Sequence, residues 1–510
     1  MSNSQMENSI KNSIVAIVFR VLQILLPFVT RTMVIKMLGL SYVGISGLFT
    51  SIFGLLSIAE LGVGSAMLHA LYEPIEHKET DRVNAIINFY RKAYWVIGIV
   101  ILIIGFILMP FLKSFIKEGT YPTELNLYYI YLVNLCSTVS SYLIYSYKAM
   151  LLEAHQLGRE ANKVKIWMTA ISYIVQIAIL VWTKNYYMYV SMVPITTIVS
   201  AVWIGKVADK RFPDFKPMGE IGGAERNNIS RDIKALFLYK IGSVVNNNVD
   251  ALVISWWFGA VVLGIYNNYY YIVSSIATVI LVVYSAVLPS IGNSIVNDTK
   301  DKNFQNFLYI SFIDSWVVGW CSICLCCLLE PFISLWVGSK GTMGVVFSIL
   351  FAFYFYIWRF PDALSIYKDA AGLWSRDKWR PLCTAILNLI LNVILIHVIG
   401  IYGILLSTIV ATLAINFPVS VKYVMDYFGK KQSIYLLFQL KYAVVTLINA
   451  LLTYSICSIV NIENLLAELL YKLCICVVFS NFIYMCIYRK NTYFRKIIGY
   501  AKCIKRENDD

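Results

Sequence analysis

Long apolar runs separated by short polar segments make up most of this 510-residue chain. An α-helix needs roughly 20 apolar residues to cross the hydrocarbon core of a bilayer, whereas a barrel strand needs about 9–11, so runs of this length predict helices. Only helices and closed barrels satisfy their backbone polar groups in lipid. We therefore expect an all-α polytopic membrane protein with about fourteen transmembrane helices, near residues 14–35, 42–70, 93–112, 125–147, 166–183, 187–205, 235–257, 262–292, 307–329, 345–367, 382–399, 401–421, 437–459 and 467–488.

The polar segments between these runs differ strongly in charge. If the N-terminus is cytoplasmic, the inner segments hold 33 Lys and Arg residues and the outer loops hold five. This bias follows the positive-inside rule and places both termini in the cytoplasm. The net charge of +14 is then a topology signal rather than a sign of nucleic-acid binding. The outer loops are short, so no sizeable domain is expected outside the membrane.

Composition supports the same fold class. The chain is 59% hydrophobic and 14% charged, against about 45–50% and 25% in soluble domains. Its eleven cysteines lie mostly in apolar runs, where cysteine behaves as a small hydrophobic residue. Cys321 and Cys324 have CxxC spacing but no nearby histidine, so we expect no metal site there.

The two halves of the chain repeat each other at an offset of about 220 residues. The segment 39–45 recurs at 259–265, Tyr147-Lys148 aligns with Tyr367-Lys368, and Arg20 aligns with Lys240. A repeat of six helices is even in number, so both copies enter the membrane in the same direction. Parallel repeats are typical of carriers that hold their substrate between two helical bundles.

The repeat and the polar segments predict five regions. These are a six-helix bundle at 1–210, a cytoplasmic connector at 211–234, a second six-helix bundle at 235–430, two further helices at 431–489 and a cytoplasmic tail at 490–510.

Ionisable residues within the apolar runs are candidate functional residues, because charges inside a bilayer are costly. Arg20 and Arg31 share one predicted helix and project within roughly 20° of each other, about 16 Å apart. They suit a cationic cavity wall that binds phosphate, since arginine can contact an anion with two parallel hydrogen bonds. The alternative is that both side chains extend to the membrane interfaces.

A second polar stripe lies in the predicted helix 235–257. Lys240, Ser243, Asn247 and Asp250 follow each other at spacings of three and four residues and so share a face. The stripe either lines a lumen, where Asp250 and Asn247 could bind a proton or a hard cation, or forms hydrogen bonds between helices.

Three further ionisable residues lie at membrane depth. Arg359 and Asp362 are three residues apart around Pro361, which favours either a local ion pair or a lumen-facing pair that a charged substrate could disrupt. Glu60 precedes Leu61 and Gly62 at a predicted close helix contact or hinge, and is a further candidate for ion or proton coupling.

The sequence lacks the motifs of several enzyme classes. It contains no GxxxxGK phosphate loop, no HExxH metal motif and no Gly-x-Ser-x-Gly nucleophile elbow. We therefore expect no catalytic residues, no cofactor and no enzymatic activity.

The segment 54–67, Gly-Leu-Leu-Ser-Ile-Ala-Glu-Leu-Gly-Val-Gly-Ser-Ala-Met, with Leu71-Tyr72-Glu73-Pro74 after it, resembles the second helix of Wzx-type O-antigen and capsule flippases. These belong to the polysaccharide-transport branch of the multidrug/oligosaccharidyl-lipid/polysaccharide (MOP) flippase superfamily. The duplicated six-helix plan with two extra helices resembles the same branch over essentially the whole chain.

This resemblance implies transport of an undecaprenyl-diphosphate-linked oligosaccharide across a bacterial inner membrane by alternating access. It implies a basic lumen, for which Arg20, Arg31 and Lys240 are the candidates by position, and a lipid-tail groove formed by the two last helices. Its implied partners are the lipid-linked glycan, the bilayer, a glycan polymerase and glycosyltransferases. Arg31 has no basic counterpart in the second half, where Ala251 aligns with it.

Three alternatives stay open. A multidrug exporter of the same superfamily, coupled to Na⁺ or H⁺, would have an acidic lumen and usually twelve helices. A membrane-embedded glycan polymerase would need catalytic residues on a large outer loop. A peptidoglycan-precursor flippase would differ only in cargo. Na⁺ or H⁺ coupling is equally open for the glycan flippase.

Overall fold

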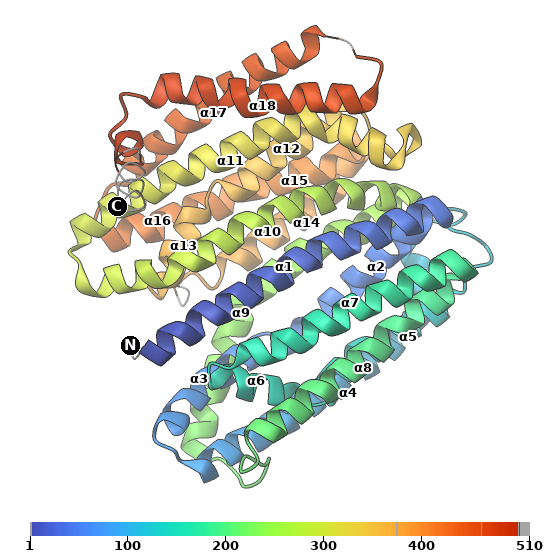
Figure 1. Ribbon diagram of the computed structural model, residues 1–510, viewed down its shortest axis with the longest axis vertical. Coiled ribbons are helices and arrows are strands. Elements are labelled where there is room, and N and C mark those ends of the chain that lie inside the picture. Colours follow the sequence, from blue (N-terminus) through green and yellow to red (C-terminus); the bar gives the residue numbers. More distant parts are fainter. Residues whose placement is uncertain (1–2, 374–375, 461, 498, 500–510) are drawn as a thin grey trace. The chain divides into compact units, whose positions relative to one another are not determined.

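The computed structural model describes residues 3–373, 376–460, 462–497 and 499, and these residues form helices with no β-strand among them. They divide into two compact units. The first consists of the residues up to 267 together with 381–385, and the second of 268–380 and the residues from 386 onward. Figure 1 shows the helices of both units.

The membrane-spanning helices confirm the expected fold class. Among the residues that the structure describes, twelve helices are long and apolar enough to cross a bilayer, and a thirteenth span results if the bent pair Leu127–Leu143 and Ser146–Ala154 is counted as one. The remaining expected span, 235–257, lies within α9 (Gly223–Phe258). Asn246, Asn247 and Asn248 reduce the apolar character of this span. The chain is an all-α multi-pass membrane protein.

In the described part of the chain, the first unit is built from the nine helices α1 to α9, the start of α10 and residues 381–385 of α14. Within it, α1 packs along α7, α5 and α7 both pack against α8, and α2 packs against α9. α9 begins at Gly223, inside the segment 211–234 that we expected as a connector. By its contacts, α9 belongs to the same compact unit as the preceding helices, whereas the sequence repeat places it in the second bundle, with the helices that follow. The bounds are α1 Asn3–Met37, α2 Leu40–Leu56, α3 Val63–Glu76, α4 Thr80–Leu108, α5 Leu127–Leu143, α6 Ser146–Ala154, α7 Gly158–Thr183, α8 Tyr186–Arg211, α9 Gly223–Phe258 and α10 Ala260–Asn297.

The second unit is organised around α11. This long helix packs against α12, α17 and α18, and α16 packs against α13 and α17 (Figure 1). Aromatic residues fill the core between these helices, with Phe307 stacked on Tyr435 at 5.0 Å between ring centroids. The bounds are α11 Lys300–Val337, α12 Val345–Arg359, α13 Asp362–Ala370, α14 Arg380–Ile399, α15 Tyr402–Ala411, α16 Phe417–Phe428, α17 Gln432–Ile459 and α18 Leu465–Tyr488.

Several expected spans are interrupted. The span 42–70 is divided into α2, the 3₁₀ turn η1 (Ser57–Glu60) and α3, with Gly62 at a φ of 88°. A Cβ at Gly62 would lie 2.7 Å from the carbonyl oxygen of Ile233 in α9, so only glycine fits this close approach. The span 125–147 bends by 48° between α5 and α6. These breaks orient polar side chains toward the interior of the first unit.

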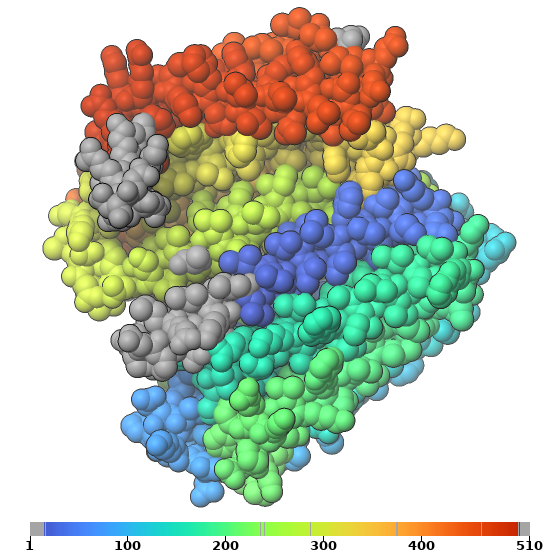
Figure 2. Space-filling model, in the orientation of Figure 1, coloured from blue at the N-terminus to red at the C-terminus, as the bar shows by residue number. Residues whose placement is uncertain are grey.

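The surfaces of both units are strongly apolar. Trp182 of α7 is 83% exposed, Ile459 of α17 is 75% exposed and Val478 of α18 is 70% exposed. In Figure 2, which is coloured by residue number, the side chains of α1 and α7 form adjoining bands on the first unit. Apolar exposure over so many helices is typical of a surface that faces lipid.

Candidate functional site

A cavity of about 790 Å³ lies within the first unit, among α1, η1, α4, α5, α6, α7 and α8. Most of its lining side chains are polar but uncharged. Hydroxyl and amide groups come from Gln23, Ser141, Ser146, Thr169, Ser172, Gln176, Thr196, Thr197 and Ser200. A cavity of this size and polarity within an apolar bundle suits a ligand rich in hydrogen-bonding groups.

A stripe on α7 forms one wall of the cavity. Lys165, Thr169, Ser172 and Gln176 are spaced by four, three and four residues, so the helix turns all four to the same side. Ser172 faces α8, where its hydroxyl lies 3.2 Å from the Thr196 hydroxyl. Gln176 is only 4% exposed. The stripe therefore gives an otherwise apolar helix a hydrogen-bonding wall.

Tyrosines form another part of the wall. Tyr94 of α4 stacks on Tyr142 of α5 with 6.1 Å between ring centroids, and the Tyr94 hydroxyl donates a hydrogen bond of 3.2 Å to Glu60. Tyr145 and Tyr173 also line the cavity. Aromatic rings beside hydroxyl groups are surfaces on which the apolar faces of sugar rings can stack.

The cavity contains little charge. Among its lining residues in the described part of the chain, Glu60 is the one acid and Lys165 the one base. Arg20 is exposed on α1, and its Nη1 donates a hydrogen bond of 3.3 Å to Oε1 of Gln23, which lines the cavity. The Arg20 guanidinium thus lies beside the cavity. Arg31, on the same helix, is half-buried and close to Tyr189 of α8.

The other predicted residues of the first unit lie on α9, outside the cavity lining. Lys240 donates a hydrogen bond of 3.0 Å from Nζ to the Ser65 hydroxyl of α3. Asn247 is exposed, and Asp250 is half-buried. The structure therefore does not bring Asp250 and Asn247 together with Glu60 in one cavity.

Arg359 and Asp362 belong to the second unit and form an ion pair, which was one of the two alternatives that their spacing left open. Arg359 ends α12 and Asp362 begins α13, so the pair spans the break at Phe360 and Pro361. Both side chains are almost fully buried, at 5% and 11% exposure.

The hydroxyl groups of the cavity were missed in the sequence, although a signal for them exists. The positions 165, 169, 172 and 176 repeat with the helical period inside a predicted span, and ionisable residues alone do not reveal this pattern.

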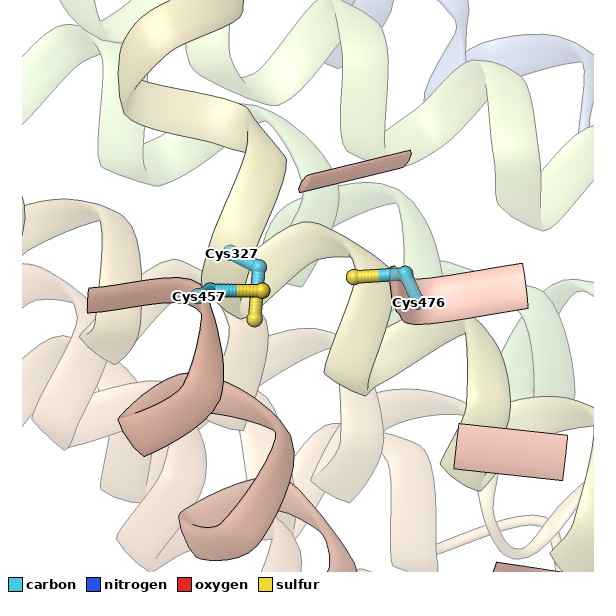
Figure 3. Close-up of side chains that lie close together, drawn as sticks. All are labelled: Cys327, Cys457 and Cys476. Carbon is cyan, nitrogen blue, oxygen red and sulfur yellow. The ribbon is translucent and has the colours of Figure 1, made fainter. Parts of the chain in front are cut away.

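Three cysteines form a cluster in the second unit that the CxxC spacing did not indicate. The Sγ atoms of Cys327, Cys457 and Cys476 lie within 4.8 Å of one another, and all three residues are buried (Figure 3). They come from α11, α17 and α18, so no local sequence pattern joins them. Thiols are soft metal ligands, yet these three pack in an apolar cluster with Leu328 and Ile475, as small hydrophobic residues do.

Several solved structures of membrane transporters have a similar fold. The lipid II flippase MurJ in an inward closed conformation matches with a TM-score of 0.67 at 15% identity, over 94% of this chain and 99% of that chain. An inward-facing MATE family transporter of the MOP superfamily matches with a TM-score of 0.58 at 12% identity, over 81% and 98%. A mutant of the Vibrio cholerae MATE transporter VcmN matches with a TM-score of 0.56 at 11% identity, over 84% and 98%. At sequence identities this low, the structural similarity shows a common fold and nothing beyond it.

Sequence comparison assigns the family. No curated protein matches the chain. The family model described as polysaccharide biosynthesis protein matches residues 9–294, which is more than half of the 510 residues. This match confirms the membership expected from the segment 54–67. The chain belongs to the polysaccharide biosynthesis protein family and has the fold of MOP-superfamily transporters.

Proposed function

We propose that this protein is a flippase that translocates an undecaprenyl-diphosphate-linked oligosaccharide across a bacterial inner membrane by alternating access. The cargo would be a repeat unit of O-antigen, capsule or exopolysaccharide. The family match supports a role in polysaccharide biosynthesis, and the fold is that of transporters. The lysine and arginine bias of the polar segments supports cytoplasmic termini.

The observation that carries the proposal is the hydroxyl-lined cavity beside Arg20. Sugars present many hydroxyl groups that need hydrogen-bond partners when they leave water, because an unpaired polar group in hydrocarbon costs several kcal/mol, about 2–7. Ser172, Thr196 and Gln176 offer such partners at the depth of the membrane. The tyrosine wall offers stacking surfaces for the same sugars.

A diphosphate needs cations in addition. Ionised groups cross hydrocarbon at a very high cost unless fixed charges compensate them. Arg20 lies beside the cavity, and Arg31 and Lys240 are the further cations of the proposed path. Guanidinium groups bind phosphate oxygens with two parallel hydrogen bonds, which suits this task.

The lipid tail would follow the two last helices. On α17, the apolar residues Leu437, Leu440, Leu447 and Leu451 are each 60% or more exposed and follow a helical stripe. Such a stripe can face an isoprenoid chain as readily as bilayer lipid. A glycan polymerase and glycosyltransferases would act on the same lipid-linked substrate and are the proposed partners.

Glu60 favours a second candidate, a cation-coupled multidrug exporter. A lone carboxylate next to the rings of Tyr94 and Tyr142 is a suitable environment for an organic cation. The same carboxylate is the candidate for H⁺ or Na⁺ coupling in the flippase, with Asp250 and Asn247 as the alternatives on α9.

Reconstitution in liposomes distinguishes the glycan-lipid flippase from the multidrug exporter. We expect the purified protein to expose a fluorescent undecaprenyl-diphosphate oligosaccharide to quencher on the opposite leaflet. Ser172→Ala together with Thr197→Val should slow this step, whereas Thr183→Val, outside the cavity lining, should not. Movement of organic cations without movement of the glycan lipid would overturn the proposal, and loss of that cation movement in Glu60→Gln would establish the exporter.

A further inference from the structure

Two carboxylates and one guanidinium are buried together in the second unit. Asp314 of α11 is 0% exposed, and Asp362 and Arg359 are likewise buried as whole residues. Arg359 donates from Nη2 to Oδ2 of Asp362, and the Tyr284 hydroxyl of α10 donates to Oδ1 of Asp314. Asp314 and Asp362 interact electrostatically, so their charges are not independent.

The cluster is held by helices on several sides. Gln439 of α17 donates from Nε2 to the carbonyl oxygen of Phe360 at 3.2 Å, which satisfies a backbone group at the break between α12 and α13. The same amide accepts a hydrogen bond of 3.0 Å from Ser315 of α11. Asp314 therefore lies at a fixed position against the start of α13.

The charges of this cluster do not balance when all its groups are ionised. Two carboxylates and one guanidinium leave one uncompensated negative charge in a region without solvent exposure. In the described part of the chain, the titratable groups that interact electrostatically with Asp314 are Tyr284, Tyr356, Arg359, Asp362 and Tyr435, and Arg359 is the one cation among them. Oδ2 of Asp314 makes no hydrogen bond of normal geometry among the described residues, and besides Tyr284 only the backbone amide of Ala363 at the start of α13 acts on this carboxylate as a donor there. A buried and unpaired carboxylate oxygen is strongly unfavourable unless it is neutralised.

We propose that Asp314 is a proton-binding site and that one exchangeable proton resides on its Oδ2. With this one proton bound, Asp314 is a neutral acid, and it lies next to the ion pair of Arg359 and Asp362, whose charges cancel. A proton fits better than a metal ion, because a hard cation such as Na⁺ needs several oxygen ligands and would lie near the Arg359 guanidinium. The binding of the proton follows from the cluster alone, and only its role as the coupling ion rests on the proposed flippase function.

The site links protonation of Asp314 to the break between α12 and α13, which interrupts the expected span 345–367. Loss of the proton would leave a net negative charge between α11 and the α12–α13 junction. Hydration of that charge requires the junction to open or α13 to shift. Proton release and movement of α13 are therefore coupled, whatever the cargo of the protein.

Infrared spectroscopy of the purified full-length protein tests the site without any glycan. A buried carboxylic acid gives a C=O stretch that is separate from the carboxylate bands. We expect this band in the wild type at neutral pH. Asp314→Asn should abolish it, and so should Asp362→Asn, because Arg359 is then free to compensate an ionised Asp314. Asp301→Asn, which alters an 83% exposed side chain, should retain it.

Three results would overturn the site. The first is absence of the carboxylic-acid band from the wild type, and the second is its persistence in both Asp314→Asn and Asp362→Asn. The third is loss of the band when K⁺ is exchanged for Na⁺ at constant ionic strength, which would indicate a sodium site. If a variant does not fold, the presence of the acid band in the wild type and its response to Na⁺ test the proton site. None of these results depends on lipid flipping, so failure of the flippase proposal and failure of the proton site are distinguishable.

Discussion

Gly44 and Gly264, which occupy equivalent positions in the two repeats, lie against each other within the first unit. A Cβ at Gly44 would lie 3.0 Å from the backbone nitrogen of Gly264, and a Cβ at Gly264 would lie 3.2 Å from the backbone nitrogen of Gly44. Each would also meet the carbonyl oxygen of the residue four positions before its partner, Ala260 or Leu40. The two copies of the repeated segment therefore cross with a local two-fold relation, which explains why both retain this glycine.

Gly44→Ala and Gly264→Ala should each destabilise the protein, because backbone atoms cannot yield to the added methyl group. We expect a cost of about 1–3 kcal/mol, as for overpacked cores, measured as the change in thermal unfolding of the purified protein. Gly292→Ala on the same helix α10 is the control, since a Cβ there meets nothing within 4 Å. Equal melting temperatures for all three variants and the wild type would contradict the close contact.

Two lysines at equivalent positions of the repeat, Lys148 and Lys368, form ion pairs that differ in burial. Lys368 contacts Asp377 with side-chain exposures of 1% and 0%, and Asp377 also binds Arg380 at 2.7 Å. Its counterpart Lys148 contacts Asp209 at 2.6 Å, where Asp209 is 59% exposed.

Lys368→Met should therefore cost more stability than Lys148→Met. Breaking a buried pair costs about 3–5 kcal/mol, and we expect the lower end because Arg380 still compensates Asp377. The exposed partner of Lys148 remains hydrated, so that change should cost below about 1 kcal/mol. Chemical denaturation of both variants measures the difference. A larger loss for Lys148→Met would show that burial does not control these pairs.

His155, outside the membrane-spanning segments, should make stability depend on pH. Its ring packs on Phe212 at 4.2 Å and Phe215 at 5.4 Å between centroids, and burial lowers its pKa. Below the ordinary histidine pKa of about 6.5, the unfolded chain therefore binds the proton more readily than the folded one. Stability that is present above this pH is lost as the pH falls through the lowered pKa.

His155→Phe keeps the ring packing and removes the titration. The melting temperature of the wild type should fall more steeply than that of this variant between about pH 7 and pH 5. Identical slopes would show that His155 binds its proton equally well in the folded and the unfolded state, which would contradict the lowered pKa.

Much of the architecture could be predicted from the sequence, because membrane helices are determined by long apolar runs and their polar boundaries. The ion pair of Arg359 and Asp362 was one of two alternatives that the sequence offered, since both residues lie on one short stretch. The partners of Asp314 were not, because Tyr284 and Arg359 come from other helices. The cavity was missed for a different reason: serine and threonine are common in apolar helices, and only the shared face of Thr169, Ser172 and Gln176 distinguishes them.

The most direct test of the account is the rate at which Arg20→Ala, Arg31→Ala and wild-type protein flip undecaprenyl-diphosphate oligosaccharide in liposomes, at equal amounts of folded protein. Loss of one charge-assisted contact of about 1.5–3 kcal/mol predicts a decrease of roughly tenfold or more in each variant. Arg20→Lys should retain part of the rate, and Arg211→Ala, on an exposed residue at the end of α8, should retain all of it. Wild-type rates in both Arg20→Ala and Arg31→Ala would contradict the claim that fixed cations on α1 carry the diphosphate through the membrane.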